Sequence, residues 1–499
     1  MVDILLAHSY FLKYDAKQTA KMKPYPPLAT LYAAALLRDR GYSVALFDAM
    51  LSDGEHEFEA ALRQHSPRFV AVYEDNFNFL TKMCLGRMRD AAQRMAEIAR
   101  RSGASVIAAG PDVGDHPDLY FRHGVQFALV GEGENSLVEL MDALFGRHPG
   151  PILSIAGVAV PDPDLPGIVR RGPERTPERS LDCFPYPAWD LLDVERYRER
   201  WKIAHGYFGL NLVTTRGCPF HCNWCAKPIW GQRYAIRSPA NVAGEMALLK
   251  RTLRPDHFWF ADDIFGLRSE WVKEFEREVT ALDAAVPFTI QSRADLITLE
   301  VARDLARAGC VEVWMGAESG SQKTLDAMDK GITVDEIAAA RAYLKGAGVR
   351  ACFFIQFGYP GETFEDILAT VRMIRDTLPD DIGVSVSYPL PGTRFHEMVA
   401  EQLGPKTNWS DSGDLAMMFQ GTYTTPFYRS LHDLLHLDLK LRQRMVSGQI
   451  SSELLVDLDR LNHAWLELGR LEAEHRSAAP TRIPKRNGVL ARPDLSKRE

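Results

Sequence analysis

The stretch of sequence that decides the fold runs from residue 216 to residue 225. It reads Arg216-Gly217-Cys218-Pro219-Phe220-His221-Cys222-Asn223-Trp224-Cys225, and it holds three of the chain's seven cysteines in the spacing C-x3-C-x2-C. Thiolates this close on one loop can converge on a single soft metal centre. Three thiolates cannot fill the four corners of a 4Fe-4S cluster, so one iron is left for an exogenous ligand. The spacing therefore predicts an open cluster, with Cys218, Cys222 and Cys225 as its metal ligands.

Two other interpretations of these cysteines remain open. His221 could complete a structural zinc site with three cysteines, although its position inside the cysteine loop gives it poor geometry for this. The cysteines could also be a coincidental group of buried thiols. A non-catalytic, metal-stabilised binding protein is therefore an alternative to an enzyme.

Composition limits the class of protein. At about 150 residues per domain, 499 residues suggest roughly three domains. The fractions of hydrophobic (46%) and charged (25%) residues exclude a disordered, collagenous or coiled-coil chain. The net charge, 59 − 66 = −7, gives no electrostatic reason to expect nucleic acid or an anionic membrane as partner.

The cellular compartment is inferred from the N-terminus and the cysteine count. The first residues have no basic lead and no small-residue cleavage site, so they do not form a signal peptide. No window approaches the roughly 18 to 20 apolar residues that a membrane helix needs. Seven cysteines are too few, and odd in number, for a secreted disulfide scaffold. We expect a cytoplasmic protein with reduced thiols.

Working outward from the cysteine loop, hydrophobic periodicity predicts an α/β protein. Residues 1–147 alternate short apolar runs with amphipathic segments, which predicts a doubly wound, Rossmann-like domain with a parallel sheet. Residues 148–205 are rich in proline and predict a linker. Residues 206–404 contain six further βα units, a partial (βα)6 barrel. A C-terminal helical cap over 405–475 and a disordered tail over 476–499 complete the chain.

The expected elements have these bounds. In the front domain the strands are 4–8, 43–48, 69–74, 105–111 and 127–132, and the helices are 28–40, 55–65, 80–102 and 136–145. In the barrel the strands are 210–215, 257–262, 288–292, 312–317, 351–357 and 383–388, and the helices are 241–252, 270–282, 299–308, 334–346 and 364–377. Two cap helices are expected at 431–445 and 453–470.

A C-x3-C-x-aromatic-C loop after the first strand of a six-unit βα barrel resembles the radical S-adenosylmethionine (SAM) superfamily. Further segments fit at other strand ends: Phe260-Ala261-Asp262-Asp263, Gly316-Ala317-Glu318-Ser319-Gly320, Gly358-Tyr359-Pro360-Gly361-Glu362-Thr363 and Tyr388-Pro389-Leu390-Pro391-Gly392-Thr393. The front domain, with Pro26-Pro27 and Gly131-Glu132-Gly133-Glu134, is similar to the cobalamin-binding domain of one large subgroup. The resemblance covers residues 1 to about 400.

The remaining cysteines narrow the subgroup. Radical SAM methylthiotransferases carry three cysteines in an N-terminal domain, whereas this front domain holds only Cys84. Auxiliary-cluster maturases carry many cysteines after the barrel, and here the last is Cys352, within an expected strand. Cys310 and Cys352 are predicted to be small buried hydrophobes, and Cys183 has no neighbouring cysteine. We therefore expect a single cluster.

The resemblance implies the cofactors and the reaction. It implies a 4Fe-4S cluster, S-adenosyl-L-methionine and cobalamin as methylcobalamin, with an external one-electron reductant such as flavodoxin or ferredoxin. Reductive cleavage of SAM would give a 5′-deoxyadenosyl radical, and an unactivated carbon, or less often phosphorus, of a small-molecule substrate would be methylated. The alternative with the same cofactors is an oxidative cyclase or ring-rearranging enzyme without methyl transfer. None of the 14 histidines lies in an Asp-x-His motif, so no lower cobalt ligand of that kind is expected.

The resemblance also implies binding residues at strand ends. The SAM candidates are Trp224, Asp262, Asp263, Ser292, Arg293, Glu318, Ser319 and Gln356. The aspartates would accept the SAM ammonium group, Ser292 and Arg293 would bind carboxylate or ribose, and Glu318 and Ser319 the ribose hydroxyls. Trp224 could instead be a core aromatic residue, and Asp262 could cap its own turn. The cobalamin candidates are Tyr73, Glu74, Asn76, Gly110, Pro111, Asp112, Gly131, Glu132, Gly133 and Glu134. No catalytic side chain is assigned.

Overall fold

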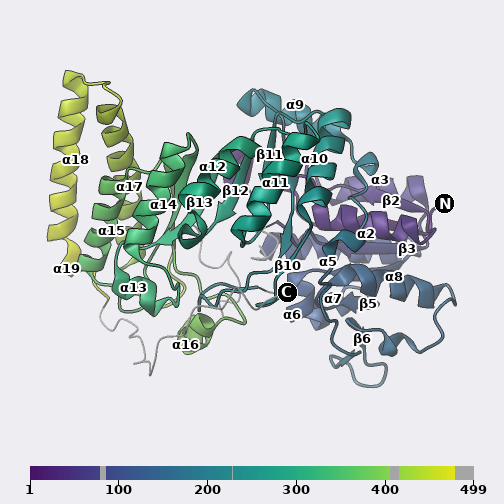
Figure 1. The fold of residues 1–499 in the computed structure, drawn as a ribbon. Helices are drawn as coiled ribbons and strands as arrows, with labels where there is room; N and C mark the ends of the chain where they lie inside the picture. Colours follow the sequence, from purple (N-terminus) through teal and green to yellow (C-terminus); the bar gives the residue numbers. More distant parts are fainter. Residues whose placement is uncertain (79–85, 228, 405–414, 478–499) are drawn as a thin grey trace. The chain divides into compact units, whose positions relative to one another are not determined.

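The computed structural model describes residues 1–78, 86–227, 229–404 and 415–477 (Figure 1). Cys84, the start of the helix expected at 80–102, residues 405–414 of the expected cap and nearly all of the expected tail lie outside the described residues. The chain forms two compact units. Unit 1 contains Met1–Cys218, Lys227–Asp262 and Glu278–Pro287, and unit 2 contains Pro219–Ala226, Asp263–Arg277 and Phe288–Glu499.

Unit 1 is built on a seven-stranded sheet with the order β2-β1-β3-β4-β5-β6-β7. Its strands are β1 (Ile4–Ala7), β2 (Val44–Phe47), β3 (Phe69–Tyr73), β4 (Ser105–Ala109), β5 (Phe127–Leu129), β6 (Val158–Pro161) and β7 (Val169–Arg171). The first five strands are parallel, and the chain reverses its direction of travel across the sheet between β1 and β3. In doubly wound folds, ligands bind beyond the carboxyl ends of the strands at this switch point.

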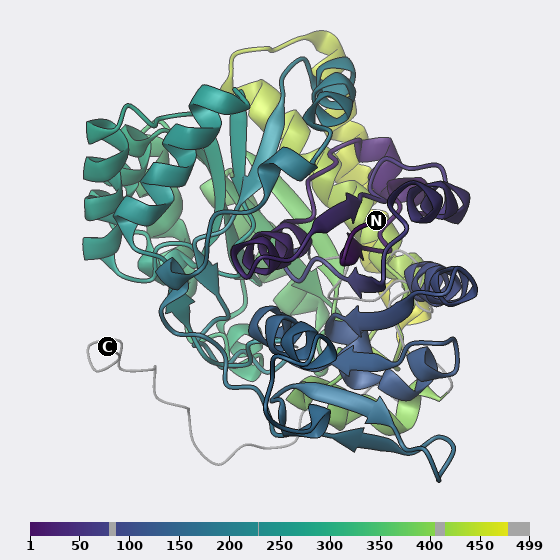
Figure 2. The ribbon, with the colours of Figure 1, turned by 90° about the vertical axis from the view of Figure 1, so that its right-hand side faces the viewer.

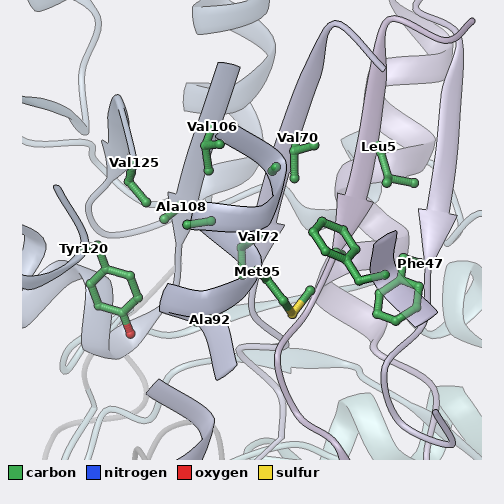
Figure 3. Packing of buried hydrophobic residues seen from close by; sticks show 14 of the residues in the cluster. Leu5, Phe47, Val70, Val72, Ala92, Met95, Val106, Ala108, Tyr120 and Val125 are labelled. Carbon is green, nitrogen blue, oxygen red and sulfur yellow. The ribbon is translucent and has the colours of Figure 1, made fainter. Parts of the chain in front are cut away.

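Helices cover this sheet and close its core. Those in contact with its strands are α2 (Leu28–Asp39), α3 (Glu55–His65), α5 (Gly86–Arg101), α6 (Pro111–Asp115), α7 (Pro117–Phe121) and α8 (Gly133–Leu144). Unit 1 also contains α1 (Ala16–Lys21), α9 (Val194–His205) and the 3-10 turns η1 (Leu12–Tyr14), η2 (Ile152–Ser154), η3 (Leu181–Cys183) and η4 (Trp189–Leu191). Figure 3 shows Met95 of α5 among the buried side chains of the strands, including Val72 and Val106. The strands are apolar along their whole length because both faces of a parallel sheet are buried.

The segment expected to be a linker, 148–205, contributes structure of its own. Strands β6 and β7 pair antiparallel with β5 and with each other, at the edge of the sheet (Figure 2). Val158 and Ala159 of β6 are buried, while Pro161 ends the strand, as suits proline on an edge strand. The many prolines obscured this hairpin, and α9 was also missed.

The second sheet has the order β15-β14-β13-β12-β11-β8. Its strands are β8 (Gly209–Leu212), β11 (His257–Phe260), β12 (Phe288–Ser292), β13 (Cys310–Glu318), β14 (Arg350–Phe357) and β15 (Asp381–Val386). Strands β8 and β11 pair in parallel in unit 1, and β12 to β15 pair in parallel in unit 2. The predicted α/β architecture with a partial barrel is confirmed. Cys310 and Cys352 are buried in this sheet, as expected.

Helices alternate with these strands. They are α10 (Pro239–Thr252), α11 (Ser269–Ala281), α12 (Leu299–Ala308), α13 (Gln322–Ala327), α14 (Val334–Gly346), α15 (Phe364–Thr377) and α16 (Arg394–Leu403), with η5 (Ala294–Leu296). Local sequence sets their starts. Thr333 with Glu336, and Thr363 with Asp366, form reciprocal capping boxes at the first turns of α14 and α15.

The C-terminal region of unit 2 is helical, as expected. It contains α17 (Thr425–Val446), α18 (Ser452–Arg470) and α19 (Glu472–His475), with α17 and α18 side by side (Figure 1). Asp438 on α17 is buried and accepts hydrogen bonds from Arg375 on α15 (2.8 Å) and from Trp465 on α18 (3.0 Å). Among the helices of the described ranges, none is long and apolar enough to cross a membrane.

Candidate functional site

The cysteine loop leaves unit 1 from a short hairpin. The strand expected at 210–215 is divided, because β8 ends at Leu212 and a separate strand β9 (Thr215–Arg216) pairs antiparallel with β10 (Ala235–Ile236). Gly217 follows β9 with φ +76°, and a Cβ atom there would lie 2.2 Å from the carbonyl oxygen of Arg233. Only glycine fits this approach, so the chain enters the cysteine loop at a fixed position.

Arg216, directly before this glycine, is bound by two candidate cobalamin residues. Its guanidinium lies 2.5 Å from Glu132 Oε1 and 2.9 Å from Glu134 Oε1, and at most 3% of each of the three side chains is exposed. Burial raises the pKa of Glu132, and Arg216 only partly offsets this. The sequence placed both glutamates toward cobalamin, whereas their carboxylates are engaged by the residue that precedes the cluster loop.

Asp262, which follows β11, accepts hydrogen bonds from a segment distant in the sequence rather than capping its own turn. Its carboxylate accepts hydrogen bonds from the backbone N–H of Thr214 (2.7 Å) and Thr215 (2.9 Å) and from the Thr214 hydroxyl (2.6 Å). Burial raises its pKa to about 6 despite these donors. The side chain therefore holds the segment that leads into β9.

In unit 2, cationic side chains surround the second cysteine. Arg293 Nη1 lies 3.9 Å from Cys222 Sγ, and its guanidinium stacks 3.7 Å from the centre of the Phe220 ring. Asp295 holds the same guanidinium from the other side, 2.9 Å from Nε. Arg293 therefore places a positive charge beside one of the predicted cluster ligands, a contact that its strand-end position did not lead us to expect.

A buried ion pair lies at the end of β13 in the same unit. Lys330 Nζ is 2.8 Å from Glu318 Oε1, and a Cβ atom on Gly316 would lie 2.4 Å from that nitrogen. Burial lowers the pKa of Lys330, but Glu318 and Cys222 raise it more, so the ammonium form is held. Glu318 has φ +59°, a left-handed conformation that costs a non-glycine residue about 1–3 kcal/mol. Lys330 also lies 6.0 Å from the centre of the Trp224 ring.

The other SAM candidates differ in whether their polar atoms already form hydrogen bonds within the protein. The Ser319 hydroxyl shares a hydrogen bond with Thr370 of α15 and accepts one from the N–H of Ser321, so it is engaged at the strand end. Ser292 donates to the carbonyl of Phe265 (3.3 Å), and Asp263 is exposed. Among the SAM candidates, two buried side-chain atoms have no hydrogen-bond partner, Gln356 Oε1 and Trp224 Nε1. Each of these atoms can form a hydrogen bond with a ligand.

The cobalamin candidates beyond β4 and β5 are engaged within unit 1. Asp112 is paired with Arg89 and accepts a hydrogen bond from Tyr120. Pro111 is the first residue of α6, and Gly110 packs on Glu74, whose Cβ would be 2.8 Å from a Cβ at that glycine. Gly133 and Glu134 begin α8 rather than forming a turn, and Tyr73 Oη fills the space beside Gly133.

The switch point between β1 and β3 retains unpartnered groups. His8 Nδ1 and Asn76 Oδ1 have no hydrogen-bond partner, although their residues are only 1% and 2% exposed. The other nitrogen of His8 is 2.9 Å from Asp48, and Glu74 accepts from the backbone of Ser9. Cobalamin carries primary amides around its corrin ring, and Asn76 Oδ1 is a suitable acceptor for one. The residues at this strand edge therefore fit cobalamin.

The cysteines fit an iron-sulfur cluster by their chemistry. Within the described ranges, no three or more His, Cys, Asp or Glu side chains gather into a group that could hold a metal ion. The case rests on the donor set: Cys218, Cys222 and Cys225 are partly exposed cysteines outside any disulfide, and they lie on one eight-residue segment. Such a set provides the three thiolates that an open cluster needs.

Sequence reasoning missed three residues of the site. Arg216 stands inside the quoted cysteine motif but received no role, and neither Lys330 nor Asp295 was assigned one. The available signal was charge: a lysine or arginine predicted to be buried requires an anionic partner. The sequence does not show which carboxylate is that partner, because the contact joins residues that are distant in the sequence.

Two protein families match separate parts of the chain. Residues 22–141 match the family described as "B12 binding domain", and residues 212–374 match the "Radical SAM superfamily".

Curated relatives include proteins of two activities. An "uncharacterized methyltransferase" of Pyrococcus horikoshii is 28% identical over 393 residues, covering 77% of this chain and 81% of that protein. The anaerobic magnesium-protoporphyrin IX monomethyl ester cyclase of Rubrivivax gelatinosus is 27% identical over 408 residues, covering 78% and 68%. Cytidylyl-2-hydroxyethylphosphonate methyltransferase of Streptomyces wedmorensis is 25% identical over 426 residues, covering 74% and 77%.

Two solved structures share the fold. The radical SAM methyltransferase TsrM from Kitasatospora setae, with tryptophan and a SAM analogue bound, has a TM-score of 0.64 at 21% identity and covers 82% of this chain and 77% of its own. The cobalamin-dependent radical SAM enzyme OxsB, with aqua-cobalamin and SAM bound, has a TM-score of 0.68 at 15% identity and covers 94% and 71%.

Proposed function

Because this chain is a radical SAM protein with a cobalamin-binding domain, we propose that it is a methyltransferase acting on an unactivated carbon, or on phosphorus, of a small molecule. Its cofactors are a 4Fe-4S cluster, SAM and cobalamin. When bound, these supply the electron, the radical and the methyl group, and the protein binds and orients them. The observation that carries the proposal is the C-x3-C-x2-C loop at a barrel strand end, in a chain that also carries a B12-binding domain.

The proposed roles follow the geometry of each unit. Cys218, Cys222 and Cys225 hold the cluster, and Arg293 and Lys330 balance the negative charge of the thiolates near Cys222. Trp224 Nε1 and Gln356 Oε1, the unpartnered groups of unit 2, hydrogen-bond SAM or the substrate. Asn76 Oδ1 binds an amide of cobalamin at the switch point of unit 1.

The choice of methyl transfer rests on the relatives. Two of the three relatives described above are named methyltransferases, one acting on a phosphonate. The second candidate is an oxidative cyclase, which the 27% identity to the Rubrivivax gelatinosus enzyme supports. A flavodoxin or ferredoxin as electron donor and a cytoplasmic location belong to the same proposal.

Turnover with methyl-labelled SAM separates these candidates. The full-length protein is reconstituted anaerobically with iron, sulfide and methylcobalamin, and is then reduced with dithionite. A methyltransferase should form S-adenosylhomocysteine together with methionine, and one labelled methyl should appear on the product. Methionine without S-adenosylhomocysteine would support the cyclase instead. Replacement of all three cysteines by alanine should abolish both products, and Cys183→Ala, which alters an exposed thiol, is the control.

A further inference from the structure

The carboxylates that follow β5 face the start of the cysteine loop. Glu132 Oε1 accepts from Arg216 and from Trp230 Nε1 (3.2 Å), while Glu132 Oε2 accepts from the backbone N–H of Glu178 (2.7 Å). Glu134 completes the pairing through an ion pair with Arg216 at 2.9 Å. Both oxygens of Glu132 are thus occupied.

An aromatic enclosure isolates the guanidinium of Arg216 from water. Four rings lie within 6 Å of it: Phe184 at 4.4 Å, Phe77 at 5.7 Å, and Tyr32 and Trp230 at 5.9 Å. Phe77 and Trp230 are stacked, with centroids 5.2 Å apart. A buried arginine left without its carboxylates would cost about 3–5 kcal/mol. The enclosure and the two carboxylates therefore fix one position for this side chain.

That position determines where the cysteine loop begins. Arg216 is the last residue of β9 and is paired with Ala235 of β10, and Gly217 is wedged against the Arg233 carbonyl. Cys218 follows at once. A shift of the Arg216 guanidinium would move the backbone only two residues from this thiol.

Much of the same loop is engaged within unit 1. Tyr73 fills the space beside Gly133, and both glutamates are paired with Arg216, although Glu134 Oε2 has no hydrogen-bond partner. Only Gly131, with φ +82°, has open space where a Cβ atom would lie. Further unpartnered groups that suit cobalamin, His8 Nδ1 and Asn76 Oδ1, lie at the switch point, in the segments that follow β1 and β3.

We propose that Glu132 and Glu134, although they lie in the B12-binding domain, are positioning residues for the iron-sulfur cluster. They hold Arg216, and Arg216 sets the backbone that presents Cys218. This inference rests on the proposed function, which identifies the cluster. The position of Glu132 and Glu134 in the chain would suggest that they bind cobalamin, whereas here they position a cluster ligand.

The test measures each cofactor separately in the full-length chain. The variants are Glu132→Gln with Glu134→Gln together, Arg216→Lys alone, and Glu139→Gln as control. Glu139 is on α8 and pairs with Arg175, away from Arg216. Cluster retention is the rate of iron loss from the reconstituted protein to a chelator, and the reduced cluster is followed by electron paramagnetic resonance with and without SAM. Cobalamin affinity is measured with hydroxocobalamin by equilibrium dialysis.

Both test variants should lose iron about tenfold faster than the wild type or more, because losing a partner behind a metal ligand typically costs about 10- to 100-fold in affinity. The response of the resonance signal to SAM should change, the Kd for hydroxocobalamin should stay within about threefold, and Glu139→Gln should match the wild type in all three. The unchanged Kd also shows that the front domain is folded.

Three results would overturn the proposal: a tenfold weaker Kd for cobalamin with wild-type cluster retention, loss of both cofactors together in Arg216→Lys, or wild-type behaviour of both variants. None of these depends on turnover. A wild-type protein that holds its cluster but neither cleaves SAM nor transfers methyl would contradict the proposed function alone.

Discussion

A carboxyl group in the loop between β14 and α15 should make the stability of the protein depend on pH. Glu362 is 2% exposed; its Oε2 accepts the N–H of Gly358 at 2.7 Å, and its Oε1 has no partner. Burial raises its pKa from 4.5 to about 8, which the Gly358 hydrogen bond opposes and Asp366 reinforces. The folded protein therefore keeps this carboxyl neutral at pH 7, whereas the unfolded chain ionises it.

The sign of the effect follows from proton binding. Between pH 4.5 and 8 the folded state binds this proton and the unfolded state does not, so stability falls as pH rises. Each pH unit in that window costs about 1.36 kcal/mol. From pH 5.5 to pH 8 the free energy of unfolding should fall by about 3 kcal/mol on account of Glu362 alone. Glu362→Gln keeps the shape and removes the titration.

The measurement is the difference between Glu362→Gln and the wild type in urea unfolding, followed by circular dichroism at several pH values. The variant should gain about 3 kcal/mol relative to the wild type as pH rises over this range. Taking the difference cancels the other titrating groups of this long chain, and Glu365→Gln, at an exposed position on α15, controls for losing one carboxyl. A difference that stays constant with pH, or falls, would refute the reasoning.

Three further outcomes follow from contacts within one unit. Gly217→Ala places a Cβ atom 2.2 Å from the Arg233 carbonyl at φ +76° and should cost at least about 1–3 kcal/mol, measured by urea unfolding, with less iron bound after reconstitution; full iron content at wild-type stability would contradict this. Lys330→Met should lower the free energy of unfolding by about 3–5 kcal/mol because Glu318 is left buried and unpaired. Adding Glu318→Gln should recover most of that loss without restoring SAM binding, and additive losses would show that the pair is not coupled. Asp438→Asn should lower the thermal midpoint, at a cost of about 1.5–3 kcal/mol, since hydrogen bonds to a charged group are lost; an unchanged midpoint would show that these bonds are replaced by water.

Element bounds were predictable where local sequence decides them. The helices expected at 55–65, 299–308, 334–346 and 364–377 have those bounds in the structure, as does the strand at 288–292. Amphipathic period and caps act within a few residues, and α14 and α15 carry capping boxes that mark their starts. The strand expected at 210–215 was wrong in its second half, because β9 is defined by pairing with β10, about twenty residues later.

Site residues were harder to predict than elements, because position at a strand end does not determine which partner a side chain takes. Asp262 and Ser319 lie at strand ends as expected, yet their oxygen atoms are used by Thr214 and Thr370. The partner of Glu132 is 84 residues away in the sequence. A local sequence pattern cannot reveal a partner so far away in the sequence. A prediction based on strand ends therefore selects the correct edge of a sheet, but it overestimates how many side chains there are available to bind ligands.

The spacing of the cysteines has a physical reason beyond the number of intervening residues. Asn223, between Cys222 and Trp224, donates from Nδ2 to the carbonyl of Ala327 (2.7 Å), and its backbone N–H bonds the carbonyl of Met328 (3.0 Å). Tyr359 donates to its Oδ1 at 2.9 Å. An amide that both donates and accepts is needed here, which neither aspartate nor leucine could replace. Asn223, the first of the two residues between Cys222 and Cys225, thus ties the backbone of this C-x2-C segment to the segment that leads to Lys330. The identity of an unspecified residue of the motif therefore has a structural reason.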